Sequence, residues 1–149
     1  MTSANPWLVA GGVSCAGAAV AHLAVIVGGP DWYRAFGAGE KLAQAAERGS
    51  WMPPAITLAI AALLAIWSAY AFSGTGLIPR LPLMRVALVA ISAILLTRGL
   101  FVFQPSAFGR PDLSPGFMFW SSLIVLAMGV LYAVGTWRAW PVLSKEVLA

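Results

Sequence analysis

Charged and reactive side chains are scarce in this sequence. Its 149 residues include one cysteine, one histidine and five acidic residues, and 9% of the chain is charged, whereas soluble domains carry roughly a quarter. The single Cys15 excludes an intramolecular disulfide and a thiol–disulfide enzyme, which needs a second cysteine. One histidine excludes bis-histidine haem ligation, and one histidine with one cysteine is too few for a closed zinc site without carboxylates. We therefore expect no metal and no cofactor.

The excess of basic residues does not indicate a protein that binds nucleic acid. Nine Lys and Arg against five Asp and Glu give a formal net charge of +4. These residues are spread along the chain and mostly lie beside apolar runs, so no basic stripe could follow a phosphate backbone. In a membrane protein, charges placed in this way usually fix the topology.

Apolar residues, by contrast, are abundant and grouped. They make up 60% of the chain, and the mean hydropathy is +0.86. A helix rises about 1.5 Å per residue and needs about 20 apolar residues to cross a bilayer. Four runs come close to that length, over residues 8–28, 55–72, 86–103 and 117–137. The sequence therefore predicts an all-α integral membrane protein, one domain over residues 1–149 built as an antiparallel bundle of four transmembrane helices.

The longest predicted connection, residues 29–52, carries a pattern of its own. Its first part, Gly-Gly-Pro-Asp-Trp-Tyr-Arg, is typical of a turn followed by interfacial aromatic residues. Residues 40–48 then predict a short amphipathic helix, because Glu40, Gln44 and either Glu47 or Arg48 fall on one face, and Leu42, Ala45 and Ala46 fall on the other. We expect this helix to lie on the membrane surface or to cap the bundle.

The distribution of charge predicts that both termini face the cytoplasm. Short loops rich in Lys and Arg stay on the cytoplasmic side. The predicted second loop and the C-terminal tail hold four basic residues against one acid, whereas the first and third loops hold four basic residues against four acids. A chain this small, with four spans, is typical of a bacterial inner membrane, and we expect it there.

Two polar residues inside the apolar runs predict where a site lies. Charges within hydrocarbon are costly and usually functional, and the third run contains Arg98, while the first contains His22. Both runs enter from the same side, and both residues lie at a similar depth in the outer half of the bilayer. We expect the two side chains to meet, with Asp31, Glu40 and Glu47 above them as partners for Arg98. Tyr33 and Gln104 complete the predicted site.

Three classes of function are compatible with such a cluster. The first is binding of an anionic or lipid-like ligand, or service as an accessory subunit beside a membrane protein partner. The second is a membrane enzyme in which His22 acts as acid or base with a loop carboxylate, and Arg98 stabilises negative charge. The third is a small oligomeric transporter. In size the chain resembles the small multidrug transporters, but those rely on an acidic residue in the first span, and this chain has none there.

Overall fold

The computed structural model describes residues 5–104 and 113–145, and every regular element within them is helical. Four helices are long and apolar enough to cross a membrane, which confirms the predicted four-span fold. They are α1 (Pro6–Gly28), α4 (Met52–Gly74), α5 (Met84–Gly99, continued by the 3₁₀ turn η1, Leu100–Val102) and α6 (Pro115–Lys145). The chain is thus a small polytopic membrane protein.

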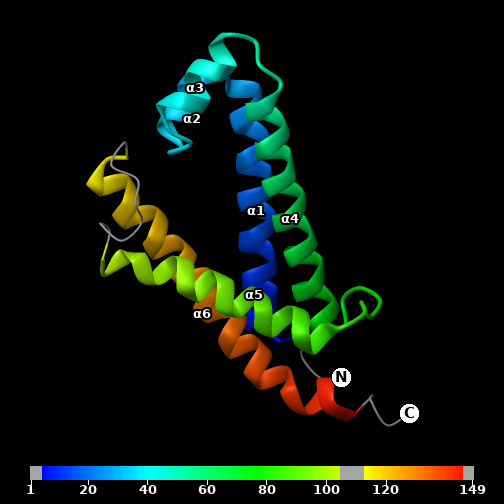
Figure 1. The fold of residues 1–149 in the computed structure, drawn as a ribbon. Coiled ribbons are helices and arrows are strands. Elements are labelled where there is room, and N and C mark those ends of the chain that lie inside the picture. The colour runs from blue at the N-terminus through cyan, green and yellow to red at the C-terminus, as the bar shows by residue number, and fades with distance from the viewer. Residues whose placement is uncertain (1–4, 105–112, 146–149) are drawn as a thin grey trace.

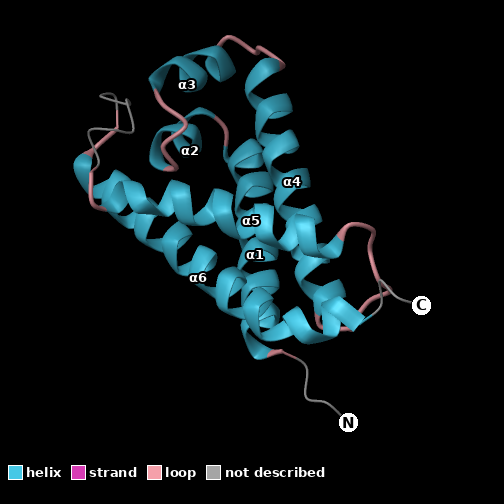
Figure 2. Ribbon diagram, turned by 60° about the horizontal axis from the view of Figure 1, so that its bottom comes forward, coloured by secondary structure: helices cyan, strands magenta, loops and turns pink. Residues whose placement is uncertain are grey.

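The long helices form two antiparallel pairs that meet at one end and diverge at the other (Figure 1). α1 packs along α4, and α5 packs along α6. The termini and the α4–α5 loop lie at the end where the pairs meet (Figures 1 and 2). There Leu8, Leu88 and Tyr132, all fully buried, belong to one apolar core that draws on all four helices.

Local sequence explains how the first helix is fixed in this core. Asn5 is its N-cap: the side-chain oxygen accepts hydrogen bonds from the backbone N–H groups of Trp7 and Leu8 at 3.2 and 3.5 Å. Pro6 follows in the first turn, where its missing N–H costs nothing. The amide nitrogen of Asn5 also donates to the carbonyl of Gly135 at 2.7 Å, so the same residue starts α1 and ties it to α6.

A cap of two short helices covers the far end of the α1–α4 pair (Figure 1). It comprises α2 (Pro30–Ala35), α3 (Glu40–Glu47) and the residues that join them. The predicted loop helix over 40–48 is therefore present. The preceding segment, predicted as a turn before its aromatic residues, instead forms helix α2, with Pro30 in its first turn. Tyr33, 1% exposed, packs with Val25 of α1 and Ala43 of α3 in a second small core under the cap.

The fourth span is longer than the sequence predicts. α6 continues past residue 137 to Lys145, with Pro141 inside it. A proline within a helix removes one backbone hydrogen bond and crowds the carbonyl four residues earlier, here that of Trp137. This backbone hydrogen bond is lost near the end of the helix, where the side chains of Trp137 and Trp140 are both exposed.

Candidate functional site

A cavity of about 490 Å³ lies between the cap and the halves of α1 and α4 nearest to it. We call it the cap cavity. Most of its wall is apolar, and three of its residues, His22, Tyr33 and Thr57, carry polar side chains. The remaining lining residues are Ala18, Ala21, Val25, Phe36, Gly37, Ala38, Leu42, Ile56 and Ile60. Phe36, Ile56 and Ile60 are each at least 41% exposed, so one side of the cavity opens toward the surroundings of the helices.

The hydrogen bond of His22 determines which of its ring nitrogens donates and which accepts. Its Nδ1 lies 2.8 Å from the carbonyl oxygen of Ala18, one turn earlier in α1. Because a carbonyl can only accept, Nδ1 must carry the hydrogen, and the neutral ring then presents Nε2 as an acceptor. His22 is therefore oriented by its own helix and offers one acceptor to the cap cavity.

Tyr33 and Thr57 form the second polar group of the cavity wall. The Thr57 hydroxyl donates to the carbonyl of Pro53 at 2.9 Å, one turn back in α4, and lies 3.5 Å from the Tyr33 hydroxyl. Both side chains are buried. This contact joins the cap to α4 and places a phenol group at the cavity wall.

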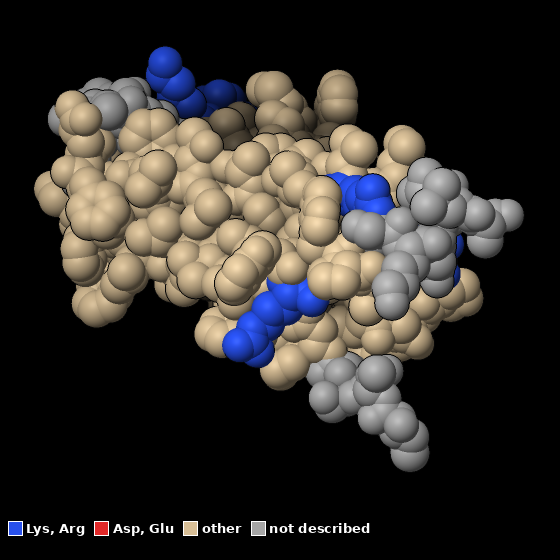
Figure 3. Space-filling view, turned by 90° about the horizontal axis from the view of Figure 1, so that it is seen from below, with Lys and Arg blue, Asp and Glu red and all other residues tan. Residues whose placement is uncertain are grey.

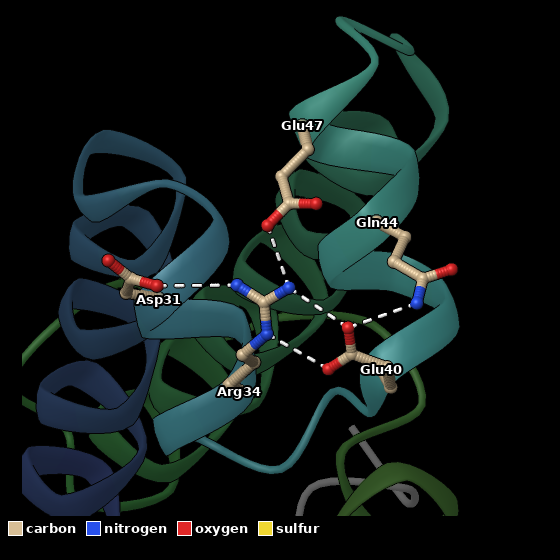
Figure 4. A network of polar contacts seen from close by, with 5 residues as sticks. All are labelled: Asp31, Arg34, Glu40, Gln44 and Glu47. Carbon is tan, nitrogen blue, oxygen red and sulfur yellow. Dashed lines mark hydrogen bonds and ion pairs between the residues drawn. The ribbon is translucent and has the colours of Figure 1, made fainter.

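Arg34 holds the two cap helices together (Figure 4). Its guanidinium donates to both carboxylate oxygens of Glu40 at 2.9 Å, to Glu47 at 2.7 Å and to Asp31 at 3.3 Å. Gln44 adds a hydrogen bond to Glu40 at 3.1 Å. Hydrogen bonds from Arg34 and then Gln44 lower the pKa of the Glu40 carboxyl, and the bonds to Glu40 and Glu47 raise the pKa of the guanidinium. We call these five residues the cap latch.

The structure separates Arg98 from the residues that the sequence placed beside it. Arg98 donates to Ser122 at 2.7 Å and to Ser121 at 3.4 Å, both on α6. It is absent from the cap cavity, which contains His22, and α1 does not pack along α5 in the described parts of the chain. The predicted meeting of His22 and Arg98 was therefore wrong.

The other predicted site residues lie at the cap cavity, in the cap latch or outside both. Tyr33 lies at the cap cavity with His22. Asp31, Glu40 and Glu47 are ion-paired with Arg34, so the expected pairing with Arg98 is not found within residues 5–104 and 113–145. Gln104 is exposed just after η1, outside the cavity.

Sequence reasoning missed Arg34 and Thr57. The signal for Arg34 was its spacing, since Asp31 is three residues earlier and Glu40 and Glu47 are themselves seven residues apart on one helix face. Thr57 gave a weaker signal, as one hydroxyl in an apolar span usually bonds its own helix backbone, and this one does.

Comparison with known protein families, curated proteins and solved structures finds no match. No group of three or more His, Cys, Asp or Glu side chains suited to a metal occurs in the part of the chain that the structure describes.

Proposed function

We propose that the protein binds a small, largely apolar molecule with an uncharged hydrogen-bonding head, which enters the cap cavity from the membrane. The observation that carries this proposal is the orientation of His22, whose Nδ1 is bonded to Ala18 and whose Nε2 remains an acceptor in an apolar wall. A hydroxyl or phenol head would donate to Nε2. Ligand sites of this kind are mostly apolar with a few polar groups that fix orientation.

The cavity wall favours an uncharged ligand over the anionic one that the sequence indicated. No Lys or Arg is among the lining residues, because Arg98 lies on the other helix pair and Arg34 points its guanidinium into the cap latch. An anion in such a wall would lose its hydration without a matching charge. A neutral amphipathic molecule loses little hydration energy, since its apolar tail contacts the side of the cavity where Ile56 and Ile60 are exposed.

The same geometry disfavours the enzyme and transporter alternatives. The enzyme that the sequence indicated needs His22 and a loop carboxylate within reach of one cavity. Asp31, Glu40 and Glu47 are instead held by Arg34, and none of them lines the cavity. Proton-coupled cation transport likewise needs an acid at the binding site, and the lining residues include none.

Filling the cap cavity is expected to remove the bound molecule. Ala21 lines the cavity, whereas its neighbour Val20 is 64% exposed and lies outside it. We expect native mass spectrometry of protein released gently from its membrane to show a stoichiometric adduct on the wild type and on Val20→Phe, but not on Ala21→Phe. His22→Leu should retain the cavity but weaken binding about tenfold by removing the acceptor. A wild type without adduct, or equal adducts on both phenylalanine variants, would contradict the proposal.

We further propose that the end carrying the termini faces the cytoplasm, in a bacterial inner membrane. Among the described residues, Lys and Arg but no Asp or Glu are visible on that end (Figure 3). The described acids Asp31, Glu40 and Glu47 all belong to the opposite end, where they offset Arg34, Lys41 and Arg48. The end whose short loops carry the excess of Lys and Arg over Asp and Glu is the one retained inside.

This orientation is tested by labelling introduced cysteines in intact cells. Leu77, 59% exposed, lies in the α4–α5 loop, and Lys41 is exposed on the cap. A membrane-impermeant maleimide should label Lys41→Cys directly and Leu77→Cys only after permeabilisation, because the native Cys15 is buried. The reverse pattern would overturn the orientation.

A further inference from the structure

A groove of about 260 Å³ lies between α5 and α6, apart from the cap cavity. Its lining residues are Val89 and Ser92 of α5 and Ala133, Thr136, Trp137 and Trp140 of α6. Val89 is 47% exposed and Trp137 is 75% exposed, so the groove is open to the surroundings of the helices. We call it the α5–α6 groove.

The wall of this groove contains a buried hydroxyl group without a hydrogen bond. Thr136 is 5% exposed, and its Oγ1 atom has no partner among the residues that the structure describes. A hydroxyl side chain in an apolar helix usually donates to the carbonyl four residues earlier. Ser92 donates in this way to Leu88 at 2.7 Å, and Thr57 to Pro53 at 2.9 Å. Thr136 departs from this pattern, and a buried donor without an acceptor is costly.

The unpaired hydroxyl indicates a ligand that supplies an acceptor. Ser92, on the opposite wall, gives its hydrogen to Leu88. No Lys or Arg is among the described residues that line the groove, so an anionic acceptor would be bound without a matching charge. A neutral carbonyl oxygen accepts a hydrogen bond without that cost. Threonine has two rotamers open to it in a helix, so Thr136 can turn its hydroxyl toward an acceptor in the groove.

The depth of the groove indicates which carbonyl is available there. Exposed indole rings prefer the headgroup level of a bilayer, and Trp137 and Trp140 stand at one end of the groove. From Pro115 to Thr136, α6 rises roughly 32 Å, about the thickness of the hydrocarbon layer. Thr136 therefore lies near the boundary between acyl chains and headgroups. The ester carbonyls of membrane lipids lie at this boundary.

The size of the groove agrees with a lipid that is only partly enclosed. Pockets that hold a whole small ligand measure about 300–1,000 Å³, and this groove is smaller. It accommodates one segment of a larger molecule, and the rest of that molecule lies outside, against the exposed side chains of Val89 and Trp137.

We propose that the α5–α6 groove binds a membrane glycerolipid through an ester carbonyl, which accepts a hydrogen bond from Thr136, with the acyl chain beside Val89 and Ala133. The chemistry is the reverse of that in the cap cavity, where His22 offers an acceptor to a ligand that donates. Diacyl phosphatidylcholine has ester carbonyls and no hydrogen-bond donor. It therefore suits the groove and cannot donate to His22, so its binding tests the groove alone.

The choice between ester and ether lipids gives the first test. Two phosphatidylcholines of equal chain length, one with ester linkages and one with ether linkages, are mixed in equal amounts in detergent micelles with the wild-type protein. Native mass spectrometry separates the two complexes by mass. We expect the first bound lipid to be the ester form by about fivefold, because the ether form lacks the carbonyl acceptor. Equal occupancy by the two lipids would overturn the proposal.

Matched valine variants then locate the hydrogen bond. Thr136→Val removes the hydroxyl and keeps a branched side chain, so we expect ester and ether lipids to bind it equally. Thr97→Val is the control, since Thr97 is exposed on α5 and does not line the groove. It should retain the preference for the ester. A preference that survives in Thr136→Val, or that disappears equally in the control, would show that Thr136 does not select the ester.

Filling the groove tests where the acyl chain lies. Ala133→Leu places a larger side chain in the groove, whereas Ala93→Leu places it on an exposed position of α5 outside the groove. We expect Ala133→Leu to lose the first bound lipid and Ala93→Leu to keep it, with both variants folded as judged by protection of the buried Cys15 from a thiol-specific dye. Equal retention of lipid by both variants would overturn the groove as the site. A wild type recovered as a lipid-free dimer that Ala133→Leu separates would overturn the lipid in favour of a second copy of the chain.

Discussion

Replacing Gly99 with alanine is expected to destabilise the protein more than a glycine-to-alanine replacement elsewhere in its helices. A Cβ atom at this position would lie 2.6 Å from the backbone nitrogen of Leu126, so α5 and α6 touch there backbone to backbone. The clash is with main chain, which has no alternative rotamer to adopt. Overpacking of this kind costs about 1–3 kcal/mol, and we expect the upper part of that range.

The control is Gly17→Ala, in the middle of α1. A Cβ atom at Gly17 would meet nothing within 4 Å. Unfolding of both variants in detergent is measured by the reaction of Cys15, fully buried in the native protein, with a thiol-specific dye on heating. We expect a clearly lower midpoint for Gly99→Ala and an unchanged or higher one for Gly17→Ala. Similar midpoints would show that α5 and α6 separate at little cost.

This close contact also explains why the sequence could predict the helices but not their partners. The spans follow from length and apolar content alone, since about 20 such residues have few other stable states. Which helices become neighbours depends instead on where small residues let backbones approach. Gly99 and Gly129 bring α5 onto α6, and a Cβ atom at Gly129 would lie 2.8 Å from the nitrogen of Leu96. Glycine positions in one chain do not reveal which surfaces they will meet.

The candidate site was predictable in the same way: the sequence identified individual residues, but it did not show which of them lie together. The sequence placed His22 of an apolar span and Tyr33 of the following loop in one predicted site, and both line the cap cavity. The prediction that His22 contacts Arg98 was wrong because two residues at the same depth in a membrane can still lie far apart in the membrane plane. His22 belongs to α1 and Arg98 to α5, and these helices lie in different, diverging pairs (Figure 1). The helix α2 was missed because six residues are too few to display a helical period.

Reversing the charge of Arg34 is expected to open the cap. Arg34→Glu replaces the only cation of the cap latch with a fourth carboxylate beside Asp31, Glu40 and Glu47, so three attractive contacts become repulsive. Hydrogen exchange of the backbone over residues 30–47 should become roughly tenfold faster or more, since exchange reports local opening. Arg48→Glu makes the same change of charge at the end of α3, outside the latch, and should leave exchange nearly unchanged.

The two proteins are also expected to respond to pH in opposite directions. In the wild type, Arg34 lowers the pKa of Glu40, so its contribution to closure is present above the unfolded value of about 4.3 and is lost as the pH falls through the lowered one. In Arg34→Glu, neighbouring carboxylates raise the pKa of Glu40 instead. Acid then neutralises the repulsion and closes the cap. Relative to the intrinsic exchange rate at each pH, exchange over the cap should therefore rise on acidification of the wild type and fall on acidification of the variant. A change of the same sign in both proteins would mean that the cap is held by the packing of Tyr33 against Val25 and Ala43, with the latch contributing little.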